Sequence, residues 1–269
     1  MQQRLCSLPG LGLLRSIKRR LTGAPASEHY RLIGTTGLTT RLVDGWKDET
    51  IPFKQRQIVN VELAQMRAGQ APLVFQVAAE AMHLTGCRNP TVLEIGCSSG
   101  YYSDAIEYLL GRKVRYVGLD YSLPLVQLGR ATYPQIPFLN GDATRLPFAD
   151  ATWDVVISGC VLLHVPDWQA AAAETVRVAQ DWCIFHRTPV GNGPTTLMAK
   201  LAYGVEVMEW LFNESEFVEL IRRHGCTLTS ALSITTGSRI EGITDNLSLI
   251  TYLFRKESCA SAQTASPAT

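Results

Sequence analysis

The stretch VLEIGCSSGYYS, residues 92–103, decides the fold of this chain. It begins as an apolar run of strand length, passes through a turn framed by Gly96 and Gly100, and continues with helical spacing. Such a turn lets a ligand approach backbone amides at the carboxyl end of the strand. The turn does not read GxGxxG, the dinucleotide fingerprint. It reads ExGxSxG, with Glu94 near the end of the strand.

Glu94 sets the charge preference of this turn. An anion beside the turn repels a pyrophosphate but favours a ligand that bears an ammonium and a sulfonium. S-adenosylmethionine (SAM) carries both groups, and its carboxylate can accept hydrogen bonds from the amides of the turn. The alternative is that Glu94 only satisfies backbone donors near the strand end.

Two further apolar runs end in acidic residues. VRYVGLDYS ends its strand at Asp120, where a carboxylate is placed to accept hydrogen bonds from a ribose diol. NGDATRLPF follows the next strand and offers Asp142 to the amino group of an adenine. For each residue an ordinary role in a turn or a cap is the alternative. Tyr121 and Ser122 are placed to contact the adenosine, and Ser122 is equally suited to cap the next helix.

Apolar runs of strand length alternate with helical stretches over residues 91–190. TVLEI and DVVIS are apolar on both faces, as strands covered by helices on both sides require. This alternation predicts an α/β fold, a doubly wound Rossmann-like and mostly parallel sheet. The strands are expected in TVLEIG, VRYVGLD, IPFLNG, WDVVISGC and WCIFHRT.

The flanking segments divide the chain further. Residues 27–90 are expected to form a lid of little regular structure followed by two helices, Phe53–Gly69 and Pro72–Leu84. Residues 91–256 form the main domain, in which 190–212 are an insertion that caps the substrate. After it, Asn213 caps a helix, Glu216 completes a capping box and Gly225 ends the helix. Then TLTSALSIT and LSLITYLFRK predict an antiparallel strand pair at the sheet edge, and residues 257–269 a disordered tail.

Composition narrows the class of protein. The chain has 269 residues, 46% of them apolar, which suffices for one sizeable domain. The net charge of +1 gives no argument for a nucleic-acid or acidic partner. Seven scattered cysteines without a CxxC pair fit neither a zinc site nor a disulfide framework, so we expect no metal and a reducing, cytoplasmic compartment. Residues 1–26 form a basic arm that is either frayed or an amphipathic helix in peripheral contact with a membrane.

LEIGCSSGYYS, GLDYS, NGDATRLPF and WDVVISGCVLLHVPD together resemble the class I SAM-dependent methyltransferases, in particular the branch acting on small molecules and lipids. The resemblance covers residues 91–190 and, more loosely, continues to 256. It implies a seven-stranded sheet whose last strand is inserted antiparallel. The middle glycine of the family's turn is Ser98 here, a small replacement that leaves SAM binding expected. The resemblance implies SAM contacts at Glu94, Gly96, Cys97, Ser98, Gly100, Asp120, Tyr121, Asp142, Ala143, Ser158, Gly159 and Cys160.

The residues that act on the acceptor are less clearly marked. Alignment for in-line attack supplies much of the rate of methyl transfer, and an oxygen nucleophile also benefits from a general base. His164 and His186 follow the fourth and fifth strands and are candidate catalytic residues. In the resembling family the segment around His164 often carries a histidine that is not known to be catalytic. Arg187 is placed to pair with a phosphate or carboxylate of the acceptor, or with a local carboxylate.

The expected activity is methyl transfer from SAM to a small-molecule, sugar or lipid-linked acceptor. A non-catalytic SAM-fold module that binds a protein partner is the main alternative. A nicotinamide-dependent oxidoreductase is disfavoured by the missing third glycine and by Glu94. A nucleic-acid methyltransferase is disfavoured because SGCV stands where an NPPY-type motif is expected and no basic domain is present. The sequence does not specify the acceptor, the methylated atom or the oligomeric state.

Overall fold

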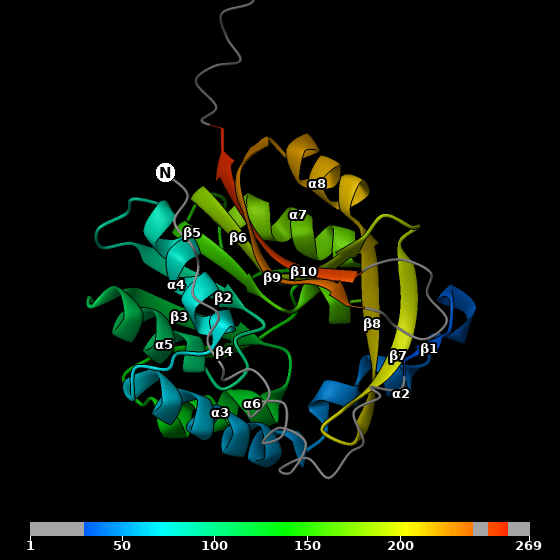
Figure 1. The fold of residues 1–269 in the computed structure, drawn as a ribbon, viewed down its shortest axis with the longest axis horizontal. Coiled ribbons are helices and arrows are strands. Elements are labelled where there is room, and N and C mark those ends of the chain that lie inside the picture. Colours follow the sequence, from blue (N-terminus) through cyan, green and yellow to red (C-terminus); the bar gives the residue numbers. More distant parts are fainter. Residues whose placement is uncertain (1–29, 239–246, 258–269) are drawn as a thin grey trace, which may run out of the picture.

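The computed structural model describes residues 30–238 and 247–257. Within these ranges the strands form one ten-stranded sheet (Figure 1). Seven of the strands make up the main domain. Across the sheet they are β4 (Phe138–Asn140), β3 (Arg115–Asp120), β2 (Thr91–Ile95), β5 (Trp153–Gly159), β6 (Ala179–Gly191), β10 (Leu247–Lys256) and β9 (Cys226–Ser238).

The direction of the strands confirms the predicted fold class. The pairs β3–β4, β2–β3, β2–β5 and β5–β6 are all parallel. The last strand, β10, is antiparallel to both of its neighbours, β6 and β9. The predicted C-terminal antiparallel pair is therefore present, but only β9 lies at the edge, because β10 is inserted between β9 and β6.

Helices cover both faces of this sheet (Figure 1). One face carries α4 (Leu73–Leu84) and α5 (Tyr101–Leu110), while α7 (Trp168–Val178) and α8 (Glu214–Arg223) lie on the other. α6 (Leu123–Thr132) follows β3.

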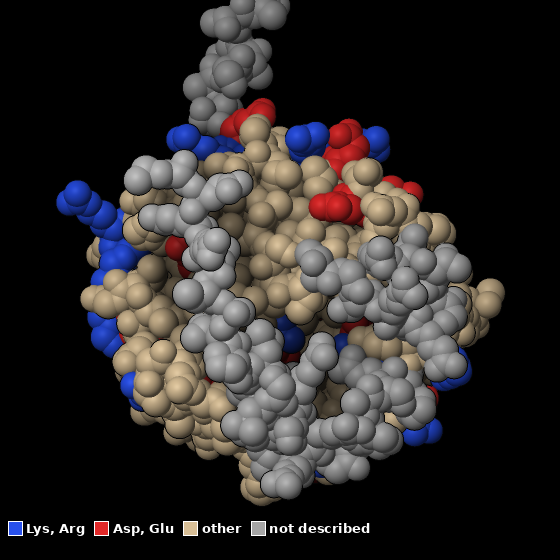
Figure 2. Space-filling view, viewed as in Figure 1, with Lys and Arg blue, Asp and Glu red and all other residues tan. Residues whose placement is uncertain are grey.

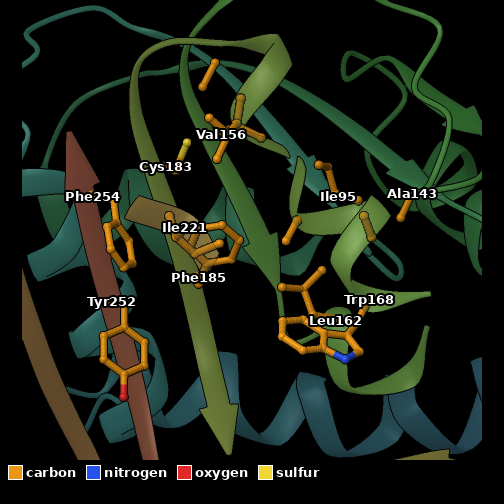
Figure 3. Close-up of a cluster of buried hydrophobic side chains, with 14 of the residues drawn as sticks. Ile95, Ala143, Val156, Leu162, Trp168, Cys183, Phe185, Ile221, Tyr252 and Phe254 are labelled. Atoms are coloured by element: carbon orange, nitrogen blue, oxygen red, sulfur yellow. The ribbon is translucent and has the colours of Figure 1, made fainter. Parts of the chain in front are cut away.

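Successive residues of a strand point to opposite faces, and the two hydrophobic cores follow this alternation. Phe185 of β6 and Phe254 of β10 belong to the core under α7 and α8, whereas Ile184 and Leu253 belong to the core under α4 and α5. Figure 3 shows the first of these cores, with Tyr252 and Phe254 on one face of β10. The cores therefore explain why these strands are apolar on both faces.

The insertion at 190–212 is a β-hairpin, which the sequence analysis did not predict. β7 (Thr196–Ala202) and β8 (Val205–Asn213) pair antiparallel around a two-residue turn, Tyr203–Gly204. Both turn residues have positive φ, 55° and 84°, as expected of the tight turns that fit the twist of a hairpin. The end of β8 pairs in parallel with the end of β6, and β1 (Arg31–Leu32) pairs with β7. The hairpin therefore extends the main sheet beside the carboxyl end of β6.

The segment before the main domain consists of short elements followed by two helices. Residues 30–50 contain only short elements, among them α2 (Thr40–Val43) and a 3-10 helix over Gly45–Lys47. The two predicted helices are α3 (Ile51–Arg67) and α4, with Pro72 immediately before α4. The predicted basic arm and the tail after Glu257 lie outside the described residues. Within the described ranges no helix is both long and apolar enough to cross a bilayer, and no cluster of potential metal ligands is found.

The start of α8 differs in one detail from the predicted capping box. Asn213 caps the helix as predicted, because its side chain accepts the backbone N–H of Glu216 at 2.9 Å. The carboxylate of Glu216 does not close the box but accepts the hydroxyl of Thr195 at 2.8 Å. The Thr195 oxygen in turn accepts the backbone N–H of Asn213 at 3.0 Å. Thr195 from the preceding loop thus stands between the two members of the box, and Gly225, with φ +80°, follows the end of the helix.

Candidate active site

The glycine-rich turn after β2 is tightly enclosed. Gly96 and Gly100 have φ values of 71° and 78°. A Cβ on Gly96 would lie 2.4 Å from the side chain of Val161, and one on Gly100 would lie 2.3 Å from the ring of Phe138. Only glycine satisfies both the backbone conformation and the space at these positions. Ser98, which stands where the family has its middle glycine, adopts φ 54°. The backbone is therefore left-handed at this position although the residue carries a side chain.

Asp120 joins the end of β3 to this turn. Its Oδ2 accepts the backbone N–H of Ser98 at 2.8 Å, and its Oδ1 accepts that of Ser122 at 2.9 Å. Burial raises the pKa of Asp120 to about 6, although these backbone hydrogen bonds oppose the shift. Each carboxylate oxygen retains a further lone pair, so the group can still accept hydrogen bonds from a vicinal diol.

Glu94 is buried under the same turn. Its Oε2 accepts a hydrogen bond from the hydroxyl of Tyr116. Its Oε1 lies close to Gly159, where an added Cβ would come within 2.4 Å of this oxygen. Burial raises the pKa of Glu94 to about 8, with a further contribution from the charge of Asp120. Among the described residues, no Lys or Arg forms an ion pair with Glu94 or Asp120. A pair of buried carboxyl groups without a cationic partner suits a ligand that carries positive charge.

The other predicted cofactor residues lie on the turns that follow β4 and β5. Asp142 is exposed, and its Oδ1 accepts both the backbone N–H and the hydroxyl of Thr144 at 2.8 Å, while Ala143 is buried. At the end of β5, Ser158 and Cys160 lie beside Leu162 and His186. The structure therefore brings the predicted residues together at the carboxyl ends of four adjacent parallel strands, β2 to β5.

Residues 43–55 are fastened across these turns, a segment we call the strap. The hydroxyl of Tyr121 donates to the carbonyl of Val43 at 3.0 Å, and that of Ser122 donates to the carbonyl of Trp46 at 2.8 Å. The Ser98 hydroxyl donates to Oε1 of Gln55, which is buried in the first turns of α3. Ser122 thus precedes α6 without capping it by its side chain. The sequence carries no signal that marks Gln55 as a site residue, because nothing in a helical pattern distinguishes it from a surface glutamine.

His186 is held inside the sheet by two hydroxyls. Its Nδ1 lies 2.8 Å from Oγ1 of Thr251, and its Nε2 lies 2.9 Å from the hydroxyl oxygen of Tyr102. Burial and the charge of Arg187 lower its pKa well below the usual range, so the ring is neutral. Because both nitrogens are engaged, His186 is placed to orient Tyr102 rather than to meet an acceptor directly.

His164 has one ring nitrogen engaged, while the other has no hydrogen-bond partner among the residues that the structure describes. Its Nδ1 lies 2.7 Å from the carbonyl oxygen of Met208 in β8. A carbonyl only accepts hydrogen bonds, so Nδ1 carries the proton and Nε2 presents its lone pair. Burial, with the charges of Lys200 and Arg187, lowers the pKa of His164 to about 3. The ring also packs against Trp46 of the strap, with centroids 4.9 Å apart.

Arg187 lies at the bend after the central part of β6, with φ 60°. Its guanidinium lies within electrostatic reach of Tyr101, Tyr102 and Tyr203. Its Nε is buried and has no hydrogen-bond partner among the described residues. Tyr101 and Tyr102, which directly follow Gly100, were not selected as site residues in the sequence analysis. The feature of the sequence that could have marked them is their position in the first turn of the helix that follows the glycine-rich turn.

Two segments from outside the parallel sheet meet over this group. The ring of Tyr203 at the tip of the β7–β8 hairpin packs edge-on against Trp46, with centroids 6.0 Å apart. The carbonyl of Tyr203 accepts Nζ of Lys54 at 2.7 Å. The hairpin tip and the strap therefore form one wall over the ends of β5 and β6.

Comparison with known proteins agrees with this geometry. A sequence profile described as a methyltransferase domain, Methyltransf_11, matches residues 93–184. The chain is 26% identical over 213 residues to a probable S-adenosylmethionine-dependent methyltransferase of Mycolicibacterium smegmatis, covering 71% of this chain and 74% of the relative. It is 32% identical over 96 residues to the demethylmenaquinone methyltransferase of Bacillus licheniformis, covering 35% of this chain and 41% of the relative. The chain thus matches less than half the length of this second relative.

Solved structures show the same fold. The 1,6-didemethyltoxoflavin-N1-methyltransferase of Burkholderia thailandensis, solved with S-adenosylhomocysteine (SAH), matches with a TM-score of 0.50 and 19% identity. The match covers 76% of this chain and 87% of that protein. A TehB-like SAM-dependent methyltransferase of Corynebacterium glutamicum also gives a TM-score of 0.50, with 18% identity, and the match covers 77% and 100% of the two chains.

The fold and the turns at the strand ends are those of the class I SAM-dependent methyltransferases, and residues 93–184 of this chain match the methyltransferase-domain profile of this family. Its match is to the Methyltransf_11 group, so it is an enzyme of methyl transfer whose cofactor is SAM. The predictions of family, enzyme class and cofactor are confirmed. The residue-by-residue contacts with SAM and with the acceptor remain predictions.

Proposed function

We propose that this enzyme transfers the methyl group of SAM to a small-molecule, sugar or lipid-linked acceptor bound under the strap and the hairpin tip. The observation that supports the proposal best is the buried pair Glu94 and Asp120, two carboxyl groups without a cationic partner at adjacent strand ends. When bound, SAM supplies an activated methyl group on a sulfonium. The residues of the chain then have to hold the two ligands in line and keep water away.

The cofactor half of the site contributes fixed hydrogen-bonding groups. Glu94 is placed for an ammonium and Asp120 for a ribose diol, while Asp142 keeps Oδ2 for an adenine amino group. Gly96 and Gly100 let the turn pass close to Val161 and Phe138, which fixes the path of the backbone beside the proposed ligand. The full proposed set is Glu94, Gly96, Cys97, Ser98, Gly100, Asp120, Tyr121, Asp142, Ala143, Ser158, Gly159 and Cys160.

The acceptor half is proposed to lie at the ends of β5 and β6. Nε2 of His164 presents a lone pair that can accept a hydrogen bond from the hydroxyl or amine to be methylated. With a pKa of about 3 this ring orients the nucleophile and is a weak base. His186 acts through Tyr102, whose hydroxyl it hydrogen-bonds. Arg187 is proposed to contact the acceptor directly.

The relatives support a low-molecular-weight acceptor. Two of those named for their acceptors are methyltransferases of demethylmenaquinone and of 1,6-didemethyltoxoflavin. The charges of this chain do not favour nucleic acid as the acceptor. Its net charge is +1, and Figure 2 shows Lys and Arg atoms spread mainly around the rim of the pictured face. Contact of residues 1–26 with a membrane surface remains part of the proposal, for a lipid-linked acceptor.

Calorimetric titration with SAM, SAH and NAD tests the cofactor half. We expect micromolar binding of both adenosyl ligands and no binding of NAD. A screen of acceptors with methyl-labelled SAM then tests transfer. If a folded sample binds SAM but labels no acceptor in any class, the main alternative gains support, a non-catalytic module that binds a protein partner. If the sample binds NAD in place of SAM, the proposed ligand assignments at Glu94 and Asp120 are wrong.

A further inference from the structure

Arg187 is a cation at the proposed acceptor site that lacks an anion. Among the described residues, no carboxylate forms an ion pair with it. Its neighbours are instead the neutral phenols of Tyr101, Tyr102 and Tyr203 and the thiol of Cys160. A buried or half-buried cation without a counterion is costly, which makes this position suited to an anion brought by a ligand.

Two buried N–H donors at this site are also without partners. They are Nε of Arg187 and Nε1 of Trp46, and neither has a hydrogen-bond partner among the described residues. Trp46 packs on the ring of His164, and Arg187 directly follows His186 in β6. Buried donors in proteins are nearly always hydrogen-bonded, so donors left over beside a proposed active site point to a ligand oxygen.

The charges around Arg187 limit the anion to a single charge. Lys200, whose charge also acts on His164, already pairs with the carboxylate of Glu209. His164 itself is neutral. One guanidinium therefore balances one negative charge, as a carboxylate carries, and not the two of a phosphate near neutral pH.

The geometry of the guanidinium also favours a carboxylate as the anion. The Nε–H of Arg187 is buried and has no partner among the described residues. The Nε edge of a guanidinium presents two parallel N–H groups, and this fork matches the two oxygens of a carboxylate.

We propose that the methyl acceptor carries a carboxylate and that Arg187 binds this carboxylate beside the methylated atom. The inference rests on the proposed function and narrows its substrate class. The rings of Trp46 and Tyr203 pack edge-on against each other, and Trp46 lies against His164, so we expect the acceptor acid to meet an aromatic wall there. The two unpaired N–H groups are closed off from solvent, so the acceptor reaches them only after the strap or the hairpin tip opens.

Binding of small probes to the SAH-saturated enzyme tests the inference. The probes are benzoate, its uncharged counterpart benzamide, and inorganic phosphate, followed by protein-observed NMR. We expect benzoate to bind about 10- to 100-fold more tightly than benzamide, as for a hydrogen-bonded ion pair. R187M should remove this preference and R187K should keep part of it. R222M, which removes an exposed arginine of α8, is the control with the same loss of charge and should leave the preference unchanged.

SAH affinity, measured on every variant, separates this inference from the proposed function. Unchanged SAH affinity together with a lost benzoate preference in R187M supports the inference. Equal binding of benzoate and benzamide to the wild type overturns it, as does tighter binding of phosphate than of benzoate. Loss of SAH binding in folded R187K would assign Arg187 to the cofactor and would also overturn it. If the wild type does not bind SAH, the proposed function fails, and the same preference measured on the ligand-free enzyme decides whether the carboxylate site stands.

Discussion

Asp120 and Ser98 are 22 positions apart in the chain, and the carboxylate of the first accepts the backbone N–H of the second at 2.8 Å. This hydrogen bond ties the end of β3 to the glycine-rich turn after β2. The second oxygen of Asp120 holds the start of the next turn through Ser122. Asp120 thus orders the cofactor turns in addition to its proposed role with a ribose.

Substitution of Asp120 by alanine is expected to lower both SAM affinity and stability. SAM binding should weaken by more than about tenfold, as for a lost hydrogen bond to a charged group. Two buried N–H groups are then left without partners, so the free energy of unfolding should fall by about 1–3 kcal/mol for each. Calorimetry and urea unfolding measure the two effects. D142A, which removes an exposed carboxylate, is the control for stability, and near-wild-type SAM affinity in D120A would contradict the ribose assignment.

Alanine at Gly96 and at Gly111 separates strain from steric conflict. Both positions have positive φ, 71° and 63°, so each alanine costs about 1–2 kcal/mol from the backbone alone. Only at Gly96 does the new Cβ meet a neighbour, Val161 at 2.4 Å, whereas nothing lies within 4 Å at Gly111. We therefore expect G96A to lose more stability than G111A and to lose SAM binding, with thermal unfolding and calorimetry as readouts. Equal effects of the two variants would show that the turn tolerates a side chain.

Binding of SAM is expected to release protons near pH 7. The pKa of Glu94 is about 8 in the ligand-free protein, so this carboxyl is mostly protonated at pH 7. The ammonium of SAM favours the ionised form and lowers this pKa, so affinity should rise with pH up to about 8. Calorimetry in two buffers of different ionisation enthalpy counts the protons, and E94Q should release fewer. The stability of the ligand-free fold should change with pH in the opposite direction. The protonated carboxyl contributes its full stability below pH 4.5, and this contribution is lost as pH rises to about 8.

His164 is expected to stay neutral across the working pH range. Its pKa of about 3 lies below the ordinary value of 6.5, so its contribution to stability is present above pH 6.5 and is lost as pH falls toward 3. Nitrogen-15 NMR of the side chain should show the Nδ1–H tautomer and no titration between pH 5 and 8. H164A should lower kcat about tenfold or more while SAM affinity changes little. A titration midpoint near 6.5 would mean that the ring is solvated and not bound to Met208.

The sequence marks the turns at the strand ends more clearly than the segments that lie over them. Strand ends and their turns leave local signals, so Glu94, Gly96 and Asp120 could be placed before the fold was known. The hairpin of β7 and β8 gave no such signal, because its apolar residues satisfy strand and helix patterns alike. Gln55 reaches the site only through the packing of α3, and Tyr203 only through the hairpin turn. Long-range contacts of this kind have no period or spacing in the chain.

The strap contacts both halves of the site, and these contacts couple the binding of the cofactor to the binding of the acceptor. Val43, Trp46 and Gln55 hydrogen-bond to the cofactor turns, while the ring of Trp46 lies against His164. A ligand that orders the strap from one side lowers the free energy needed to order it from the other, and this coupling is reciprocal. We therefore expect sequential kinetics, in which the cofactor binds first, the acceptor binds to the closed complex, and SAH leaves last as an inhibitor competitive with SAM.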